Sequence, residues 1–554
     1  MVPWRTMATA PEERGTPSLR ERARRLAGWA ATPLALLFLQ LASAMYYWAP
    51  ENGRGALAPT FELAGILVVA VATGWRRWPL AVVGRVVAGL VVLALLVLGF
   101  GEGLARLEFG YDVVLAIDMK YVPVLFGMLF RADSVGHAIF VCVIIVLILA
   151  GVLSGIWFSL RRLQTVAADP ARRKWHLGGT AAALVACTLI FGLHRPLTRV
   201  VLDQLDIALH SKQRNEFVAK QMELEVAQNR GLRWKAGKSR PTIFFFVVES
   251  YGEAALTQAQ FSGFRDWLAT EAAGLSANGY SIRSHYLVSS VFGGSSWMAD
   301  ATLLCGVKVN NQQRYEALKQ AQLSCLPEIL NKNGWDTMFA AGNTTFVDDS
   351  FRRLFPFAHM LLKDDFGYTG PRYSWSYIPD QFVIEQVERM LLAKRTATSL
   401  PAFVLYMLTS SHHPWSRIPP YLDRWEDLGD GSIFNQVKGQ QFLGNRFLSG
   451  TSYAEGFDAS LRYALHTVFE YVKTLPAGEP APLVIILGDH QPRKPLGDMK
   501  KDNWWVPLYI VSRDPKAVDR WAEMGYVPGV VPDHAKGALP LERFGDQLLK
   551  VLGE

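Results

Sequence analysis

Long apolar stretches fill much of the first 194 residues of this chain, and short clusters of arginine separate them. A helix of about 20 apolar residues crosses the roughly 30 Å hydrocarbon core of a bilayer. The pattern therefore predicts an α-helical membrane bundle with five transmembrane helices, which forms an N-terminal domain over residues 1–194. We expect these helices at residues 28–49, 58–74, 79–101, 137–160 and 177–194.

Arginine and lysine collect before the first span, between the second and third, and between the fourth and fifth. By the positive-inside rule these three segments are cytoplasmic, and so is the N-terminus. An odd number of spans then places everything after His194 on the opposite side of the membrane. We expect the amphipathic stretch at 104–133 to lie along the membrane interface.

The pattern changes twice after the last span. Residues 195–240 are polar and charged and predict a helical connector near the membrane surface. From residue 241 to 554, short apolar runs rich in β-branched and aromatic residues alternate with amphipathic segments, which predicts a mainly parallel sheet covered by helices. The expected strands are PTIFFFVVES, PAFVLYMLTSS, LVIILGDH and VPLYIVS, and the expected helices are CLPEILNKNGW, QFVIEQVERMLLAK and SLRYALHTVFEYVKTL.

Chemically active side chains follow three of these expected strands. In parallel sheets the ligand site lies beyond the carboxyl ends of the strands, so these side chains should meet at one edge. Each strand end alone is more typical of a turn or a solvated cap than of a site, but three together favour a site for one divalent metal, Zn²⁺ or Mn²⁺. The side chains are Glu249 after the first strand, Ser410, Ser411, His412 and His413 after the second, and Asp489 and His490 after the third.

The stretch SSVFGGSSWMADATLLCG, residues 289–306, predicts a tight glycine turn followed by a helix that begins at Ser295 or Ser296. The N-terminus of a helix favours anions, and a serine beside a divalent cation can lose its proton and attack phosphorus. The alternative is that either serine only caps the helix.

Composition narrows the class of protein. The chain is 50% hydrophobic with a mean hydropathy of +0.13, which is typical of a membrane protein of this size. Much of the net charge of +8 lies in the predicted cytoplasmic loops, so we expect no nucleic-acid binding. Cys305 and Cys325 lie in the part expected outside the cytoplasm, where a disulfide between them is one hypothesis and two free thiols the other.

In this order, VVES, FGGSSWMAD and LGDH after a membrane bundle resemble the sulfatase-like branch of the alkaline phosphatase superfamily. Within it, the chain resembles membrane phosphoglycerol and phosphoethanolamine transferases such as lipoteichoic acid synthase and the phosphoglycerol transferase of periplasmic glucans. The resemblance covers residues 241–512 and implies an α/β alkaline-phosphatase-like domain.

The resemblance also implies roles for individual residues. Glu249, Asp489 and His490 would bind the metal, and Ser296 would complete the metal shell and act as the nucleophile, with Asp300 at the acidic position four residues later. His412 would be the histidine at the substrate phosphate. Further substrate-binding candidates are Ser295, Arg352, Arg353 and His413. Asp380 lies in a matching PDQ, without an assigned chemical role.

The departures from the family narrow the reaction. SSWMA lacks the Pro and Arg of the motif that matures to formylglycine in true sulfatases, so we do not expect sulfate ester hydrolysis. Phosphoethanolamine transferases of lipid A carry several cysteines in the exported domain, and this chain has two there, which favours phosphoglycerol.

The resemblance implies a bacterial inner-membrane enzyme with a periplasmic C-terminal domain. It would move a phospholipid headgroup through a phosphoserine to a glycan or lipid acceptor. The alternatives are a phosphatase or phosphodiesterase that uses the same site, or a non-catalytic envelope scaffold.

Overall fold

The protein is described by a computed structural model that separates into two compact units, residues 1–104 with 134–205 and residues 105–133 with 206–554. Most of the predicted interfacial stretch at 104–133 and the outer ends of several predicted spans lie outside the described residues. The described residues are 19–43, 60–75, 81–109, 119, 135–191, 197–230, 234–237, 239–396, 398–442, 451–492 and 503–553.

The described residues of the first unit form apolar helices. Two of them contain segments long and apolar enough to cross a membrane, Ala81–Gly99 and Cys142–Ala168, and shorter apolar segments lie at Ala30–Ala42 and Glu62–Gly74. N-terminal apolar helices are thus present, and the number of five spans stays a prediction. The helices are α1 (Leu19–Ser43), α2 (Phe61–Trp75), α3 (Ala81–Phe109), α6 (Val135–Ala168) and α7 (Pro170–Phe191).

A buried glutamine joins three of these helices. Gln164 on α6 donates from Nε2 to Thr73 Oγ1 on α2 at 2.9 Å, and its Oε1 accepts from Arg85 Nε on α3, also at 2.9 Å. Polar side chains in an apolar bundle are stable when they bond to one another in this way. Gln164 therefore fixes the relative positions of α2, α3 and α6.

The second unit is built around a nine-stranded sheet with the order β10-β2-β9-β8-β1-β5-β3-β4, in which β11 pairs with β2. The four predicted strands are present as β1 (Ile243–Val248), β5 (Ala402–Leu408), β8 (Leu483–Gly488) and β9 (Trp505–Ser512). The core of the sheet is parallel, whereas β9 runs antiparallel to β8 and β2. The strands that the pattern did not predict are β2 (Ser281–Val288), β3 (Asp336–Ala341), β4 (His359–Leu362), β10 (Val527–Pro528) and β11 (Ala538–Pro540).

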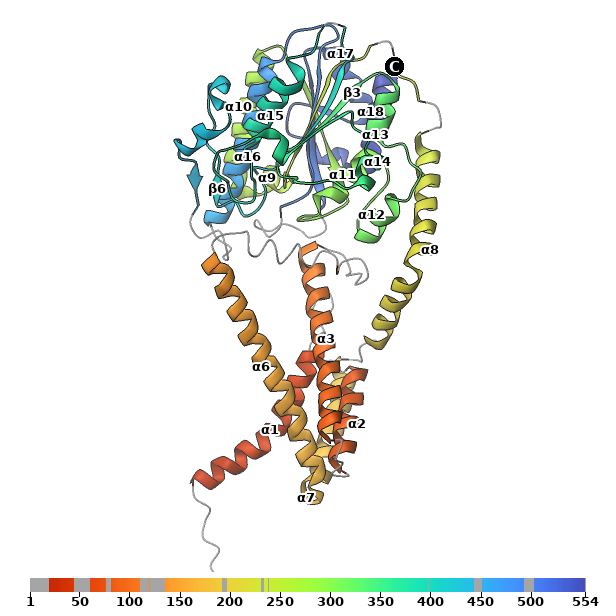
Figure 1. Ribbon diagram of the computed structural model, residues 1–554, viewed down its shortest axis with the longest axis vertical. Helices are drawn as coiled ribbons and strands as arrows, with labels where there is room; N and C mark the ends of the chain where they lie inside the picture. Colours follow the sequence, from red (N-terminus) through yellow and green to blue (C-terminus); the bar gives the residue numbers. More distant parts are fainter. Residues whose placement is uncertain are drawn as a thin grey trace, which may run out of the picture. The chain divides into compact units, whose positions relative to one another are not determined.

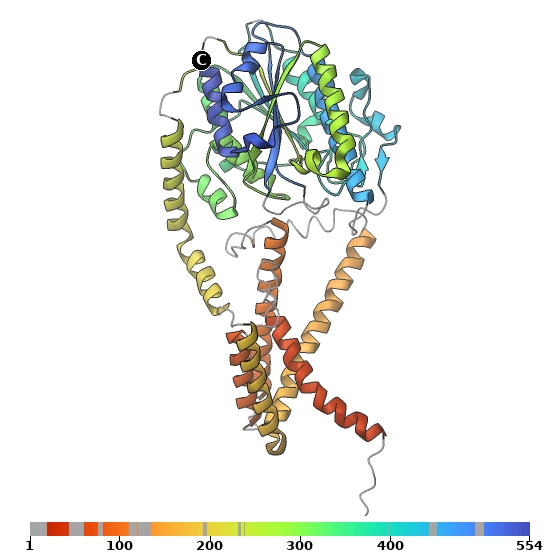
Figure 2. The ribbon, with the colours of Figure 1, turned by 180° about the vertical axis from the view of Figure 1, so that it is seen from behind.

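Both faces of the sheet are covered by helices, as Figures 1 and 2 show from opposite sides. The side chains of β1 alternate between two cores, with Phe246 stacked on Tyr406 on one face and Phe245 against Phe544 on the other. This explains the unbroken apolar run of β1, since a strand buried on both faces needs no polar position. One face carries α10 (Ser262–Ala277), α15 (Asp380–Val387) and α16 (Thr451–Thr474); the other carries α11 (Ser296–Cys305), α13 (Leu326–Lys332), α14 (Asp349–Leu354) and α18 (Phe544–Gly553).

The predicted connector is largely helical. It forms α8 (Leu197–Arg230), which is kinked at His210. The part of α8 beyond this kink contributes Met222 and Val226 to the same core as α11 and α18. The connector is therefore packed against the α/β unit over its C-terminal half.

Candidate metal centre and nucleophile

Three side chains that the sequence predicted to meet do lie together at the carboxyl edge of the sheet. Glu249 follows β1, and Asp489 and His490 follow β8; one ligand atom from each lies within 4.8 Å of the others. His490 Nε2 is 3.2 Å from Glu249 Oε1 and 3.4 Å from Asp489 Oδ2. All three side chains are buried.

The surrounding backbone fixes which atoms of these side chains face one another. Asp489 Oδ1 accepts the N–H groups of Ser250 and His490, each at 2.7 Å, so that Oδ2 faces the cluster. His490 Nδ1 lies 2.8 Å from the carbonyl oxygen of Gln491, and Nε2 therefore points to the carboxylates. In metal sites, a hydrogen-bond partner of this kind on the other ring nitrogen orients the imidazole.

The cluster combines two carboxylates with one imidazole in a buried place. Burial raises the pKa of Glu249, but the charge of His412 and contacts with His490 outweigh it and lower the pKa to about 2. Burial and the charge of Glu249 raise the pKa of Asp489 to about 7. Burial lowers the pKa of His490, but Asp489 and Glu249 raise it to about 9. Two carboxylates thus compete for one positive partner.

Ser296 is held against this cluster by an unusual turn. Gly293 and Gly294 have φ of 71° and 152°, and Ser295 has φ of 65°, a left-handed conformation that is rare without glycine. The turn starts α11 at Ser296, whose Oγ donates to Glu249 Oε2 at 3.0 Å and lies 3.2 Å from His490 Nε2. The geometry therefore distinguishes the two candidate serines, because it is Ser296 whose hydroxyl contacts the cluster.

Ser295 lies beside it with a different environment. Its Oγ is buried and has no hydrogen-bond partner among the described residues. A buried hydroxyl without a partner costs stability unless a ligand or water satisfies it. Asp300 lies on the first turns of the same helix, where burial and the charges of Asp489 and Glu249 raise its pKa well above the usual value.

The loop after β5 brings His412 to the site. The ring of His412 stacks on Trp375, with centroids 4.8 Å apart, and its charge acts on Glu249. His412 Nδ1 contacts the carbonyl oxygen of His413. Ser411 Oγ donates to the backbone oxygen of Glu249 at 2.7 Å, which ties this loop to the end of β1.

The other candidates lie elsewhere. The ring of His413 packs against Trp415 and Tyr453, with ring centroids 5.3 and 5.6 Å apart. Arg352 and Arg353 are exposed on α14, and Arg352 donates to Met360 Sδ at 3.5 Å. Their roles in substrate binding stay predictions.

Two further residues support the site: Asp380, which the sequence singled out without a role, and Gln491, which sequence reasoning missed. The Asp380 carboxylate, at the start of α15, accepts the N–H groups of Thr409 at 2.9 Å and Ser410 at 3.1 Å, and so holds the loop that carries His412. Gln491 accepts from Ala254 N–H and donates to the carbonyl of Trp505. PDQ and DHQ mark both positions in the sequence, but only the fold shows what they bind.

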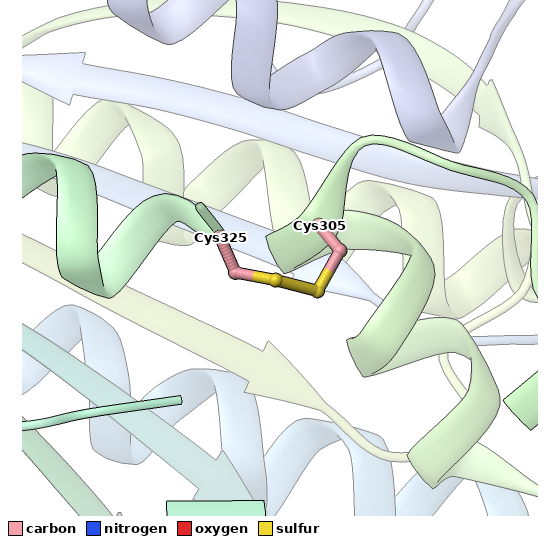
Figure 3. Close-up of a disulfide and its surroundings, with 2 residues drawn as sticks. All are labelled: Cys305 and Cys325. Carbon is pink, nitrogen blue, oxygen red and sulfur yellow. A yellow bond between two sulfur atoms is a disulfide. The ribbon is translucent and has the colours of Figure 1, made fainter. Parts of the chain in front are cut away.

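Cys305 and Cys325 are joined in a disulfide, which Figure 3 shows in close-up. The bond connects the last residue of α11 to the residue that precedes α13. The helix that begins with Ser296 is therefore anchored at both ends, by the cluster and by a covalent bond.

The donor set fits a divalent metal. Oxygen atoms of Glu249, Asp489 and Ser296 and one imidazole nitrogen converge, and the two carboxylates would both be satisfied by a doubly charged cation. A mainly parallel sheet with this group at its carboxyl edge defines an α/β domain with a candidate metal centre. Residues 241–512 match the family model described as Sulfatase.

Comparison with solved structures gives several similar chains. The lipooligosaccharide phosphoethanolamine transferase A of Neisseria meningitidis is 12% identical with a TM-score of 0.42, covering 96% of this chain and 95% of that one. The lipoteichoic acid synthase LtaP of Listeria monocytogenes is 15% identical with a TM-score of 0.34, covering 52% and 71%. The phosphoglycerol transferase GacH of Streptococcus pyogenes is 14% identical with a TM-score of 0.32, covering 55% and 75%. A search of curated proteins gave no match.

Proposed function

We propose that this protein is a membrane-bound, metal-dependent phosphotransferase that moves a phospholipid headgroup to a glycan or lipid acceptor. The observation that carries the proposal is the position of Ser296, whose Oγ contacts Glu249 and His490 at the start of α11. The match of residues 241–512 to the Sulfatase family model supports ester chemistry at this group, and the apolar helices of the same chain support attachment to a membrane.

In the first step, Ser296 Oγ forms a bond to the phosphorus of the headgroup, and the bond from phosphorus to the diacylglycerol oxygen breaks. A cation held by Glu249, Asp489 and His490 would lower the pKa of the serine hydroxyl and neutralise charge on the phosphoryl oxygens. The serine proton passes to bulk water, and His412 gives its own proton to the diacylglycerol oxygen. The buried hydroxyl of Ser295 and the N-terminus of α11 donate to the phosphoryl oxygens.

In the second step, a hydroxyl of the acceptor attacks the phosphoserine. Its proton passes to His412, the new oxygen–phosphorus bond forms, and the bond to Ser296 Oγ breaks. Ser296 Oγ takes a proton back from bulk water, so that Ser296 and His412 both return to their starting protonation states. The contact of His412 Nδ1 with the carbonyl of His413 supports Nε2 as the nitrogen that exchanges the proton.

We also propose where each part of the chain lies relative to the membrane. We place the domain of residues 241–554 in the periplasm of a bacterial inner-membrane protein, with residues 1–194 as a multi-pass bundle, residues 195–240 as the connector and the N-terminus in the cytoplasm. The disulfide supports an oxidising compartment for this domain. The small number of cysteines favours phosphoglycerol over phosphoethanolamine as the cargo.

The test is to trap the intermediate. Full-length protein, purified in detergent and loaded with Zn²⁺ or Mn²⁺, is incubated with phosphatidylglycerol or phosphatidylethanolamine and digested, and the peptide that contains Ser296 is analysed by mass spectrometry. We expect an added headgroup whose mass identifies the cargo. The variant Ser296→Ala should lose the adduct, and Ser295→Ala should keep it at a lower level.

An adduct on Ser295, or none on either serine while headgroup is released, would contradict the assignment of the nucleophile. An adduct that passes to water even when glycan and lipid acceptors are present would identify a hydrolase. Absence of both metal and adduct would favour a scaffold.

A further inference from the structure

A large cleft on the α/β unit lies outside the site described above. It has a volume of about 1240 Å³, above the roughly 300–1,000 Å³ of most small-molecule pockets. Its walls come from α10, α16 and the segment 418–421, which continues the loop that carries His412. A cleft of this size fits a chain of several linked units better than a single small molecule.

The cleft is joined to the candidate active site by ring contacts. Tyr453, which lines it, lies against Trp415 with centroids 4.8 Å apart and against His413 at 5.6 Å. His413 is the neighbour of His412, whose charge acts on Glu249. These contacts connect the lining of the cleft to the loop that carries the proposed proton donor.

Several aromatic side chains line the cleft, and three of them that are partly exposed are each held by a neighbour. Trp267 lies 5.4 Å from Phe264 and has the guanidinium of Arg462 5.1 Å from its ring centre. The hydroxyl of Tyr421 accepts from Trp425 Nε1 at 3.0 Å. Tyr453, described above, is the third. These rings are partly exposed and preorganised, so little side-chain entropy is lost when a ligand stacks on them.

Charged groups line the same cleft. Asp458 accepts two bonds from Arg462, and Glu271 Oε1 lies 2.9 Å from His466 Nδ1. An acyl chain here would strip water from these charges without replacing its hydrogen bonds, which is costly. A sugar suits the same wall, because its ring has apolar C–H faces for aromatic stacking and hydroxyl edges for carboxylates and guanidinium groups.

A second metal does not explain this cluster. Glu271, His466 and Glu470 lie close enough to hold an ion, but Lys473 already contacts Glu470 and lies 4.0 Å from Glu271 Oε2. The ammonium group supplies the positive charge that a metal would bring. The cluster is an ion-pair network that shapes one wall of the cleft.

We infer that this cleft binds the acceptor, and that the acceptor is an oligosaccharide whose hydroxyl reaches the phosphoserine beside His412. The inference rests on the proposed function for its chemistry, and it narrows the acceptor from a glycan or lipid to a glycan. The aromatic and charged lining and the contact of Tyr453 with His413 carry it.

The experiment measures sugar binding and the donor reaction separately. Full-length protein is prepared in a detergent without a sugar headgroup, and binding of maltoheptaose, cellohexaose and laminarihexaose is followed by saturation-transfer NMR. The variants are Trp267→Ala, Trp267→Phe and, as a matched control, Phe217→Ala, an exposed aromatic residue on α8 that does not line the cleft. The headgroup adduct on Ser296 is measured in the same samples.

We expect at least one oligosaccharide to bind, Trp267→Ala to weaken its binding about tenfold, and Trp267→Phe and Phe217→Ala to keep it. The Ser296 adduct should form equally in all variants. If the adduct forms but no oligosaccharide binds, or if Trp267→Ala leaves binding unchanged, the inference that this cleft binds the acceptor is overturned, while the proposed function stands. A smaller adduct yield in Trp267→Ala without sugar binding assigns the cleft to the lipid donor and overturns the inference. Sugar binding without any adduct in the wild-type protein overturns the proposed function and the acceptor role.

Discussion

Asp380 is a buried carboxylate with no positively charged partner among its described contacts. Its charge should therefore have a measurable effect on the stability of the protein. The carboxylate is 1% exposed and accepts the backbone N–H groups of Thr409 and Ser410. Burial is the main cause that raises its pKa to about 7, and the charge of Glu249 adds to it. The folded protein therefore holds a proton here that the unfolded chain releases near pH 4.

The sign of the pH dependence follows from this difference. Between about pH 4 and pH 7 the folded state binds more protons at this position than the unfolded state, so stability falls as pH rises, and the loss is complete above the folded pKa. The prediction is tested with Asp380→Asn, which has the same shape, keeps an acceptor for the two N–H groups and carries no charge. At about 1.4 kcal/mol for each pKa unit, the stability of Asp380→Asn relative to wild type should rise by about 4 kcal/mol between pH 4 and pH 8.

The assay is the apparent Tm of the full-length protein in detergent, followed by tryptophan fluorescence from pH 5 to pH 8. A free energy of about 4 kcal/mol corresponds to roughly 8 °C in a domain of this kind, and most of the change should appear in this range. Asp519→Asn, at an exposed carboxylate paired with Arg283, serves as the control and should follow the wild-type curve. A difference between Asp380→Asn and wild type that stays constant with pH would refute the reasoning.

Three further outcomes follow from the site. When metal is present at about 100 times its Kd, removing it with a chelator should lower the free energy of unfolding by about 3 kcal/mol, which is measured as a lower Tm. Glu249→Gln should abolish this response. Cys305→Ser should lower the free energy of unfolding by about 3 kcal/mol, because the disulfide closes a loop between residues 20 positions apart. Alkylation of this variant before and after reduction should show no reducible pair of cysteines. Gly252→Ala should cost about 1–3 kcal/mol and weaken metal binding in a titration, because its Cβ would lie 2.0 Å from Gln491 Oε1 and 2.7 Å from Gln491 Cα.

The sequence predicted the central strands and the residues at their ends for a clear reason. β1, β5 and β8 are buried on both faces, so each appears as an apolar run that ends at a polar group. β2 was missed because Arg283, Ser284 and His285 interrupt its apolar pattern at the side of the sheet. The role of Asp380 was missed because its partners lie 29 and 30 residues away, and no local spacing indicates such a contact.

The position of the metal cluster is a consequence of strand register. β1 and β8 pair so that Val248 lies beside Gly488, and the next residue on each strand is a proposed ligand, Glu249 and Asp489. A slip of one residue would turn the side chains of β8 to the opposite face and separate the two carboxylates. Gly488 allows this pairing to continue to the edge, because a Cβ there would lie 1.8 Å from the carbonyl oxygen of Tyr251. The glycine in LGDH is therefore part of the site: it lets the backbone after Glu249 cross close to β8, where the N–H of Ser250 reaches Asp489 and turns its second oxygen toward the cluster.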